Sequence, residues 1–176
     1  MTCYGAKELA ESLRGVRKHT IQIAEDIPEA QYSFKATSES RSVGQLLVHI
    51  ALGYRFQQDV HATEQRTTLA GMDFPALIKR LGEEEAQPRS KAQVIELLQR
   101  NGDAWTSWLE GLSEDFLAER VQMPGEPPAS KSRFEMLLST KEHEMHHRGQ
   151  LMLIERLLGI VPHLTRERQA RMQPKS

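Results

Sequence analysis

Apolar residues recur at three- and four-residue spacing through four long segments, and this period constrains the fold more than any other feature. A stripe with that period covers one face of an α-helix, which has to be buried against another element. The segments run over about 7–26, 42–61, 90–111 and 134–159. Because no stretch shows a credible strand alternation, the pattern predicts an all-α protein folded as a four-helix bundle.

The ends of these segments carry helix-capping signals. In a capping box, a serine side chain binds free amides of the first helical turn and a residue three positions later reaches back. Boxes of this form stand at Ser42–Gln45, Ser90–Gln93 and Ser132–Glu135. Pro28 ends the first segment and Gly159 the last. The sequence therefore places the helix boundaries as well as the helices.

A long connection separates the second and third segments. It contains a short helical pattern over 74–81, followed by an acidic stretch, 82–85, that is expected to be an exposed loop. A connection of about 25 residues is unusual inside a compact domain unless it crosses the bundle. We therefore expect a crossover, with the second and third long helices parallel. The connection over 113–131 is predicted to be loop, because prolines interrupt it.

Length and composition limit the class of protein. A chain of 176 residues suits one domain, assigned to 1–164, with a basic tail over 165–176. The net charge of −1 offers no electrostatic reason to expect a nucleic-acid or membrane partner. The single cysteine, Cys3, excludes an internal disulfide and fits a reducing compartment. With no apolar leader or membrane-spanning run, we expect a soluble, cytoplasmic protein.

Three of the seven histidines fall on predicted inward faces: His49, His143 and His147. His143 and His147 are four residues apart, so both rings leave the same face of the last helix. Neutral imidazole binds divalent metals, and a bundle core can bring side chains of facing helices together. Three protein ligands leave a coordination position open, as in catalytic rather than structural zinc sites. Gly53, one turn after His49, would leave room near the ring.

The sequence also allows other interpretations of these residues. A histidine on an apolar face is often only a hydrogen-bonded core residue, and a pair four residues apart can arise by chance. His146 lies about 100° round the helix from His147 and is left out of the ligand set. Glu144 directly follows His143, as in the zinc motif His-Glu-x-x-His, but the third downstream ligand of that motif is missing. Gln45, one turn before His49, could reach the edge of the site.

Two stretches resemble the DinB superfamily. They are Arg41-Ser-Val-Gly-Gln-Leu-Leu-Val-His49-Ile-Ala and His143-Glu-Met-His146-His147-Arg148-Gly149-Gln150-Leu, the second followed by Leu158-Gly159-Ile-Val-Pro162. The likeness extends from about Leu9 to Pro162. It implies a four-helix bundle with a crossover between the second and third helices. It also implies a divalent metal bound by His49, His143 and His147. For Gly149 we expect a close approach to a neighbouring helix.

The resemblance implies an enzyme that uses a low-molecular-weight thiol in metal-assisted S-transfer or, less expectedly, in hydrolysis. Zinc or nickel is the expected metal, with iron or manganese also possible. The alternative is a non-catalytic stress-response protein whose metal stabilises the bundle. A small-molecule substrate and a homodimer are expected. No catalytic acid or base can be assigned, although Glu142, Glu144 and Gln45 are near in sequence.

Overall fold

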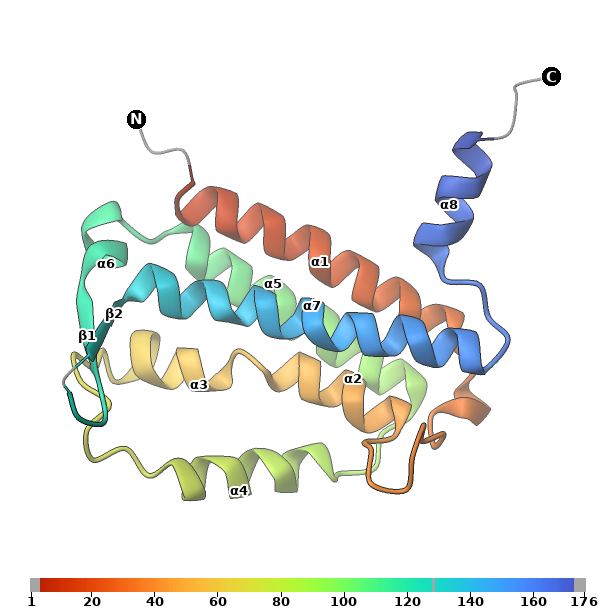
Figure 1. Cartoon of the computed structure of the whole chain (residues 1–176), viewed down its shortest axis with the longest axis horizontal. Helices are drawn as coiled ribbons and strands as arrows, with labels where there is room; N and C mark the ends of the chain where they lie inside the picture. Colours follow the sequence, from red (N-terminus) through yellow and green to blue (C-terminus); the bar gives the residue numbers. More distant parts are fainter. Residues whose placement is uncertain (1–3, 128, 173–176) are drawn as a thin grey trace.

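The computed structural model describes residues 4–127 and 129–172 and contains a bundle of four long helical segments (Figure 1). Helix α1 packs against α5 and α7, and α2 packs against the same two helices, which closes the bundle around one core. Their bounds are α1 Ala6–Asp26, α2 Val43–Leu52 with its continuation α3 Arg55–Gln57, α5 Lys91–Glu110 and α7 Arg133–Leu157. The predicted all-α four-helix bundle is confirmed.

The connection between the second and third long helices crosses the bundle. A short turn, η1 (Glu29–Gln31), precedes α2, and helix α4 (Phe74–Glu85) follows α3 and returns along its outer side. Because α4 brings the chain back, α2 and α5 run in the same direction (Figure 1). The predicted crossover is therefore present. In the described part of the chain, no helix is long and apolar enough to cross a membrane.

Helix α4 is longer than predicted, and the expected exposed loop over 82–85 is its last turn. Leu81 packs against the core, and Glu85 lies one turn later on the same side. The Glu85 side chain is only 13% exposed. The loop prediction was wrong because the acidic run over 82–85 indicates exposure to solvent when the residues that pair with it, which lie far away in the sequence, are not known.

The single helix predicted over 42–61 is interrupted. The amide of Gly53 donates to the carbonyl of Ile50, three residues back, and α2 ends there. After α3 the chain widens into a π-helical turn, η2 (Gln58–Thr63). This turn carries His61 into the core, where its Nδ1 accepts from Arg133 Nη1 at 2.9 Å. His61 is thus paired away from His49, His143 and His147.

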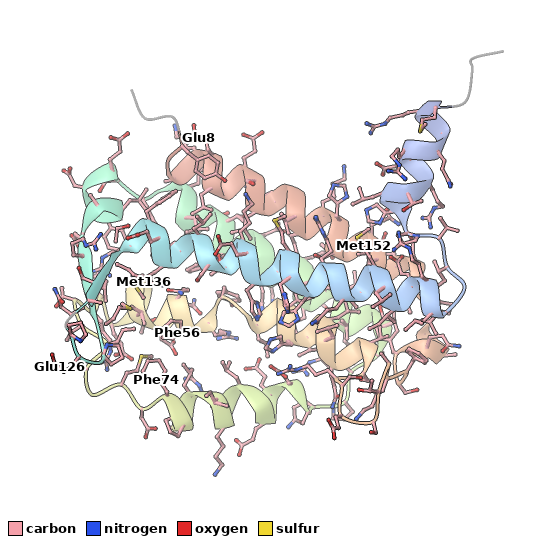
Figure 2. The ribbon with its side chains drawn as sticks, in the orientation of Figure 1. Glu8, Phe56, Phe74, Glu126, Met136 and Met152 are labelled. Atoms are coloured by element: carbon pink, nitrogen blue, oxygen red, sulfur yellow. The ribbon has the colours of Figure 1, made fainter. Side chains whose placement is uncertain are left out.

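The predicted loop over 113–131 contains regular structure that the sequence analysis missed. Helix α6 (Glu114–Ala118) precedes an antiparallel hairpin, β1 (Arg120–Met123) and β2 (Ala129–Ser132). Four residues per strand are too few to show a clear alternation. The hairpin supports a small apolar cluster in which Phe56 of α3 faces Phe74 of α4 (Figure 2).

The chain after the bundle is also helical. Helix α8 (His163–Met172) takes in most of the predicted basic tail, and positions 173–176 of that tail lie outside the described residues. The domain limit at 164 stays a prediction.

A buried ion pair joins α1 to α7 inside the bundle. The Arg17 guanidinium donates from Nε and Nη2 to both oxygens of Glu144, each at 2.9 Å. Arg17 is 7% exposed and Glu144 2% exposed. Thr20 Oγ1 adds a third hydrogen bond to the carboxylate at 2.7 Å. Because both charges are desolvated, removing either partner leaves the other as an unpaired charge in the core, which destabilises the fold.

We expect Glu144→Leu to lower the free energy of unfolding by about 3–5 kcal/mol, because it leaves the Arg17 charge buried and unpaired. Urea unfolding followed by circular dichroism measures the loss. The double variant Arg17→Met/Glu144→Leu should recover much of it.

The exposed pair Arg14–Glu110, which joins α1 to α5 with both side chains more than 40% exposed, provides the control. Glu110→Gln should lower the free energy of unfolding far less than Glu144→Leu does, since water and salt screen such pairs. Equal losses for Glu144→Leu and Glu110→Gln would contradict the assignment of a buried, structurally essential pair.

Candidate metal centre

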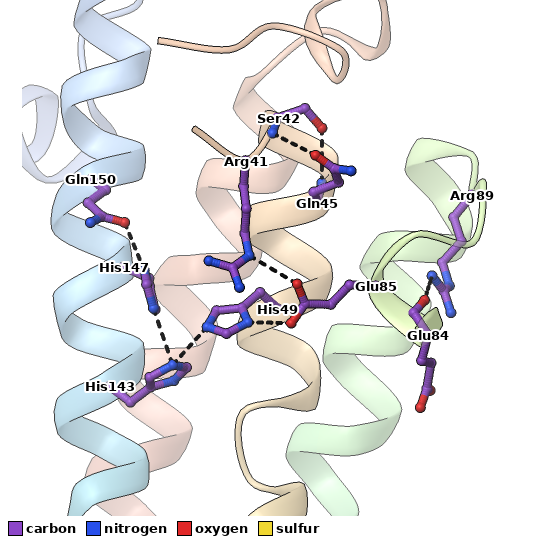
Figure 3. A network of polar contacts seen from close by, with 10 residues as sticks. All are labelled: Arg41, Ser42, Gln45, His49, Glu84, Glu85, Arg89, His143, His147 and Gln150. Carbon is purple, nitrogen blue, oxygen red and sulfur yellow. Dashed lines mark hydrogen bonds and ion pairs between the residues drawn. The ribbon is translucent and has the colours of Figure 1, made fainter. Parts of the chain in front are cut away.

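The rings of His49 on α2 and of His143 and His147 on α7 point at one another between the two helices (Figure 3). Nε2 of His143 lies 3.0 Å from Nε2 of His49 and 3.2 Å from Nε2 of His147. One ligand atom from each residue lies within 4.8 Å of the others, close enough for one ion to be held by all three. The structure thus brings the three predicted residues together.

Two of the rings have a hydrogen-bond partner at Nδ1, the nitrogen that faces away from the other histidines, and this bond sets the tautomer. Glu85 Oε1 accepts from His49 Nδ1 at 2.5 Å, and Gln150 Oε1 accepts from His147 Nδ1 at 2.8 Å. Because these oxygens only accept, each Nδ1 carries a proton, and in the neutral form of each ring Nε2 then directs a lone pair at His143. A proton on His143 Nε2 can satisfy only one of its two short contacts.

A divalent cation satisfies all of these lone pairs. Tetrahedral zinc with bonds of about 2.0–2.1 Å separates neighbouring ligand nitrogens by about 3.3 Å. The distances of 3.0 and 3.2 Å between the Nε2 atoms are close to that value. The donor set of three imidazole nitrogens, with the Nδ1 protons of His49 and His147 held by acceptors, therefore fits a divalent metal.

Burial keeps the α7 histidines neutral. Desolvation, together with the neighbouring histidines, lowers the pKa of His143 to about 4. Desolvation also lowers the pKa of His147, although the hydrogen bond to Gln150 acts in the opposite direction. Neutral imidazole is the form that binds metal, so both rings are in that form at neutral pH.

Gly53 makes room for the His143 ring. A Cβ atom at Gly53 would lie 2.7 Å from His143 Nδ1 and 2.8 Å from its Cε1, closer than real Cβ contacts. The glycine predicted to leave space near His49 therefore leaves it for the histidine of the facing helix. Gly149, by contrast, is exposed, and a Cβ atom there would have no neighbour within 4 Å, so the close helix approach predicted for it is wrong.

Glu85 is the site residue that sequence reasoning missed. Besides accepting from His49, its carboxylate accepts from Arg41 Nε at 3.0 Å. Burial opposes ionisation of Glu85, but the hydrogen bonds from His49 and Arg41 outweigh it and leave its pKa below the ordinary value. The one available signal was Leu81, four residues earlier. If the helix predicted over 74–81 continues for one more turn, Glu85 lies on the same face as this apolar residue.

Other candidates lie outside the triad. Gln45 closes the capping box on Ser42 and does not reach the histidines. Glu144 points toward Arg17 of α1 and not toward the other histidines, so the zinc motif of adjacent His and Glu is not formed. His146 is exposed and contacts Gln150 Nε2 at 3.2 Å. This contact orients the Gln150 amide so that its oxygen meets His147.

The fold and this site define a crossover four-helix bundle with a candidate three-histidine metal centre. Residues 12–151 match the family model described as the DinB superfamily. The chain therefore belongs to that superfamily, as the His49 and His143 segments indicated. No curated protein matches the chain.

Solved structures share the fold at low sequence identity. A DinB-like protein, YjoA from Bacillus subtilis, is 20% identical over 86% of this chain and 92% of its own, with a TM-score of 0.63. YfiT from Bacillus subtilis is 16% identical over 91% of each chain (TM-score 0.65) and is described as "a probable metal-dependent hydrolase with an unusual four-helix bundle topology". A DinB-family protein from Exiguobacterium sibiricum is 20% identical over 90% and 94% (TM-score 0.60).

We expect Gly53→Ala to displace the His143 ring and weaken zinc binding about ten- to hundredfold, the range for changes that disturb ligand orientation. Zinc affinity is measured by competition with a chromophoric chelator on the folded variant. Gly149→Ala is the matched control: it adds a methyl group to an open position and should leave zinc affinity unchanged. Equal affinities for the two variants would show that Gly53 does not shape the site.

Proposed function

We propose that the chain is a metal-dependent enzyme in which His49, His143 and His147 hold one divalent ion, zinc or nickel, and that it transfers a small thiol onto an electrophilic substrate. The observation that carries the proposal is the convergence of the three Nε2 atoms, with distances of 3.0 and 3.2 Å from His143 to the other two. His147 also lines a cavity of about 600 Å³, in which a small molecule would lie beside the triad. Cytoplasmic location and homodimerisation stay predictions.

A divalent ion bound there would supply Lewis acidity and bring the pKa of a coordinated thiol or water toward neutrality. Burial keeps His143 and His147 neutral, and Glu85 and Gln150 orient His49 and His147 by accepting hydrogen bonds from their Nδ1 atoms. In the transfer, the thiol sulfur forms a bond to the electrophilic carbon while the bond to the leaving group breaks. The leaving group takes the bonding electron pair, and the thiol proton passes to solvent.

The carboxylates near the triad favour a thiol nucleophile over water. Hydrolytic zinc sites commonly use a free glutamate as general base. Here Glu85 is held by His49 and Arg41, and Glu144 is held by Arg17. A thiol ionises near pH 8.5 even when free, so it needs far less help than water.

Hydrolysis is the second candidate, because YfiT is described as a probable metal-dependent hydrolase. If this chain hydrolyses its substrate, Glu39 is the candidate base, since among the described residues it is the one acid that lines the cavity beside His147.

We expect tag-free protein to bind about one zinc or nickel ion per chain, and His49→Ala to bind well under one while remaining helical. The reason is that two imidazoles hold an ion much less tightly than three. Elemental analysis and circular dichroism measure the two properties. The exposed His146→Ala is the control and should retain the ion. A full complement of metal in His49→Ala would overturn the ligand assignment.

The thiol dependence and the products of turnover distinguish thiol transfer from hydrolysis. Zinc- and nickel-loaded protein should consume an electrophile only when a low-molecular-weight thiol is added, and Glu39→Gln should retain that activity. Mass spectrometry of the products distinguishes a thioether from a hydrolysis product. Thiol-independent hydrolysis that is lost in Glu39→Gln would favour the second candidate. A large metal-dependent rise in melting temperature without turnover of either kind would favour a stabilising metal.

A further inference from the structure

The cavity beside His147 is lined by both apolar and polar residues. Its volume of about 600 Å³ lies in the range of small-molecule sites. The apolar lining comes from Leu46 of α2 with Leu153 and Ile154 of α7. The polar lining includes Arg41 and His147. A ligand that fills the cavity therefore contacts apolar carbon as well as a cationic group near the histidine triad.

Arg41 is held so that part of its guanidinium is free. Its Nε donates to Glu85 at 3.0 Å, which anchors the group beside His49. Its Nη1 and Nη2 make no hydrogen bond to any residue that the structure describes, and Figure 3 shows them directed away from Glu85 toward the side of His147. The side chain is 44% exposed. Two parallel donors of this kind match the two oxygens of a carboxylate.

Hydrogen-bond donors, rather than net charge, favour a carboxylate at this end. The charge of Arg41 is paired with that of Glu85, and Glu85 also accepts from His49. Glu39 lines the cavity as well, is exposed and forms no ion pair within residues 4–127 and 129–172, so its charge works against an anion. The unpaired donors next to the triad thus belong to Arg41.

We propose that this cavity binds a small carboxylate with an apolar body, a substrate class that deepens the proposed function and rests on it. The carboxylate pairs with Nη1 and Nη2 of Arg41, and the apolar part lies along Leu46, Leu153 and Ile154. The remaining functional group of the ligand then lies at the histidine triad. Arg41 is a specificity residue for this substrate, tied to the triad through Glu85.

Hexanoate and its neutral isostere hexanamide test the proposal by calorimetry or ligand-observed NMR on the full chain. Hexanoate should bind more tightly than hexanamide, and Arg41→Met should weaken hexanoate about ten- to hundredfold while leaving hexanamide unchanged. Arg148→Met is the matched control, because Arg148 follows His147 in the chain but does not line the cavity. Leu153→Ser, at a position 59% exposed, should weaken both ligands about fivefold without affecting the fold.

Each titration is run on metal-free and on zinc-loaded protein, which separates this proposal from the proposed function. Arg41-dependent preference for hexanoate in metal-free protein supports the cavity assignment even if zinc binding fails. Hexanoate binding that requires zinc and survives Arg41→Met would place the carboxylate on the metal and overturn the proposal. Equal affinity for hexanoate and hexanamide, or no saturable binding of either, would overturn it as well.

Discussion

Helix α7 is held at one rotation by the buried pair of Glu144 with Arg17. The carboxylate receives hydrogen bonds from Arg17 and Thr20, all inside the bundle. Residues next to each other on a helix point about 100° apart, so holding Glu144 toward α1 directs His143 toward α2. A rotation of α7 that turned His143 away from α2 would also leave the Glu144 charge unpaired in the core. The position of the triad therefore depends on an ion pair that takes no part in it.

The facing helix is adapted to this arrangement. Helix α2 ends at Leu52, and Gly53 lets the His143 ring approach its backbone. The same helix supplies His49 one turn earlier. Because the His143 ring fills the space of the missing Cβ, the glycine that weakens the helix is the residue that allows the histidines of two helices to meet.

The crossover is part of the site rather than a simple connection. It returns the chain along the outside of the bundle as α4, whose last residue, Glu85, supports His49 and holds Arg41. The crossover thus supplies the hydrogen-bond acceptor for His49 Nδ1 and holds Arg41 by its Nε alone. A bundle with a short second loop would lack this carboxylate.

Much of the fold and the three histidines could be predicted from the sequence, because helix period, capping boxes and the spacing of His143 and His147 are local properties. The predictions failed where local signals were weak: the hairpin strands are too short to alternate, and the acidic end of α4 resembles a solvated loop. The break after Leu52 was also missed, since Gly53 alone does not show whether a helix bends or continues.

The amino-acid sequence by itself determined four amphipathic helices and placed three imidazoles on their inner faces. Only the tertiary structure decided the rotation of α7, the hydrogen bond between His49 and Glu85, and which guanidinium nitrogens of Arg41 stay unpaired. These features depend on contacts between residues far apart in the chain, such as Arg17 with Glu144 and His49 with Glu85. Such contacts form only when burial brings separate helices together, so no local period or spacing records them.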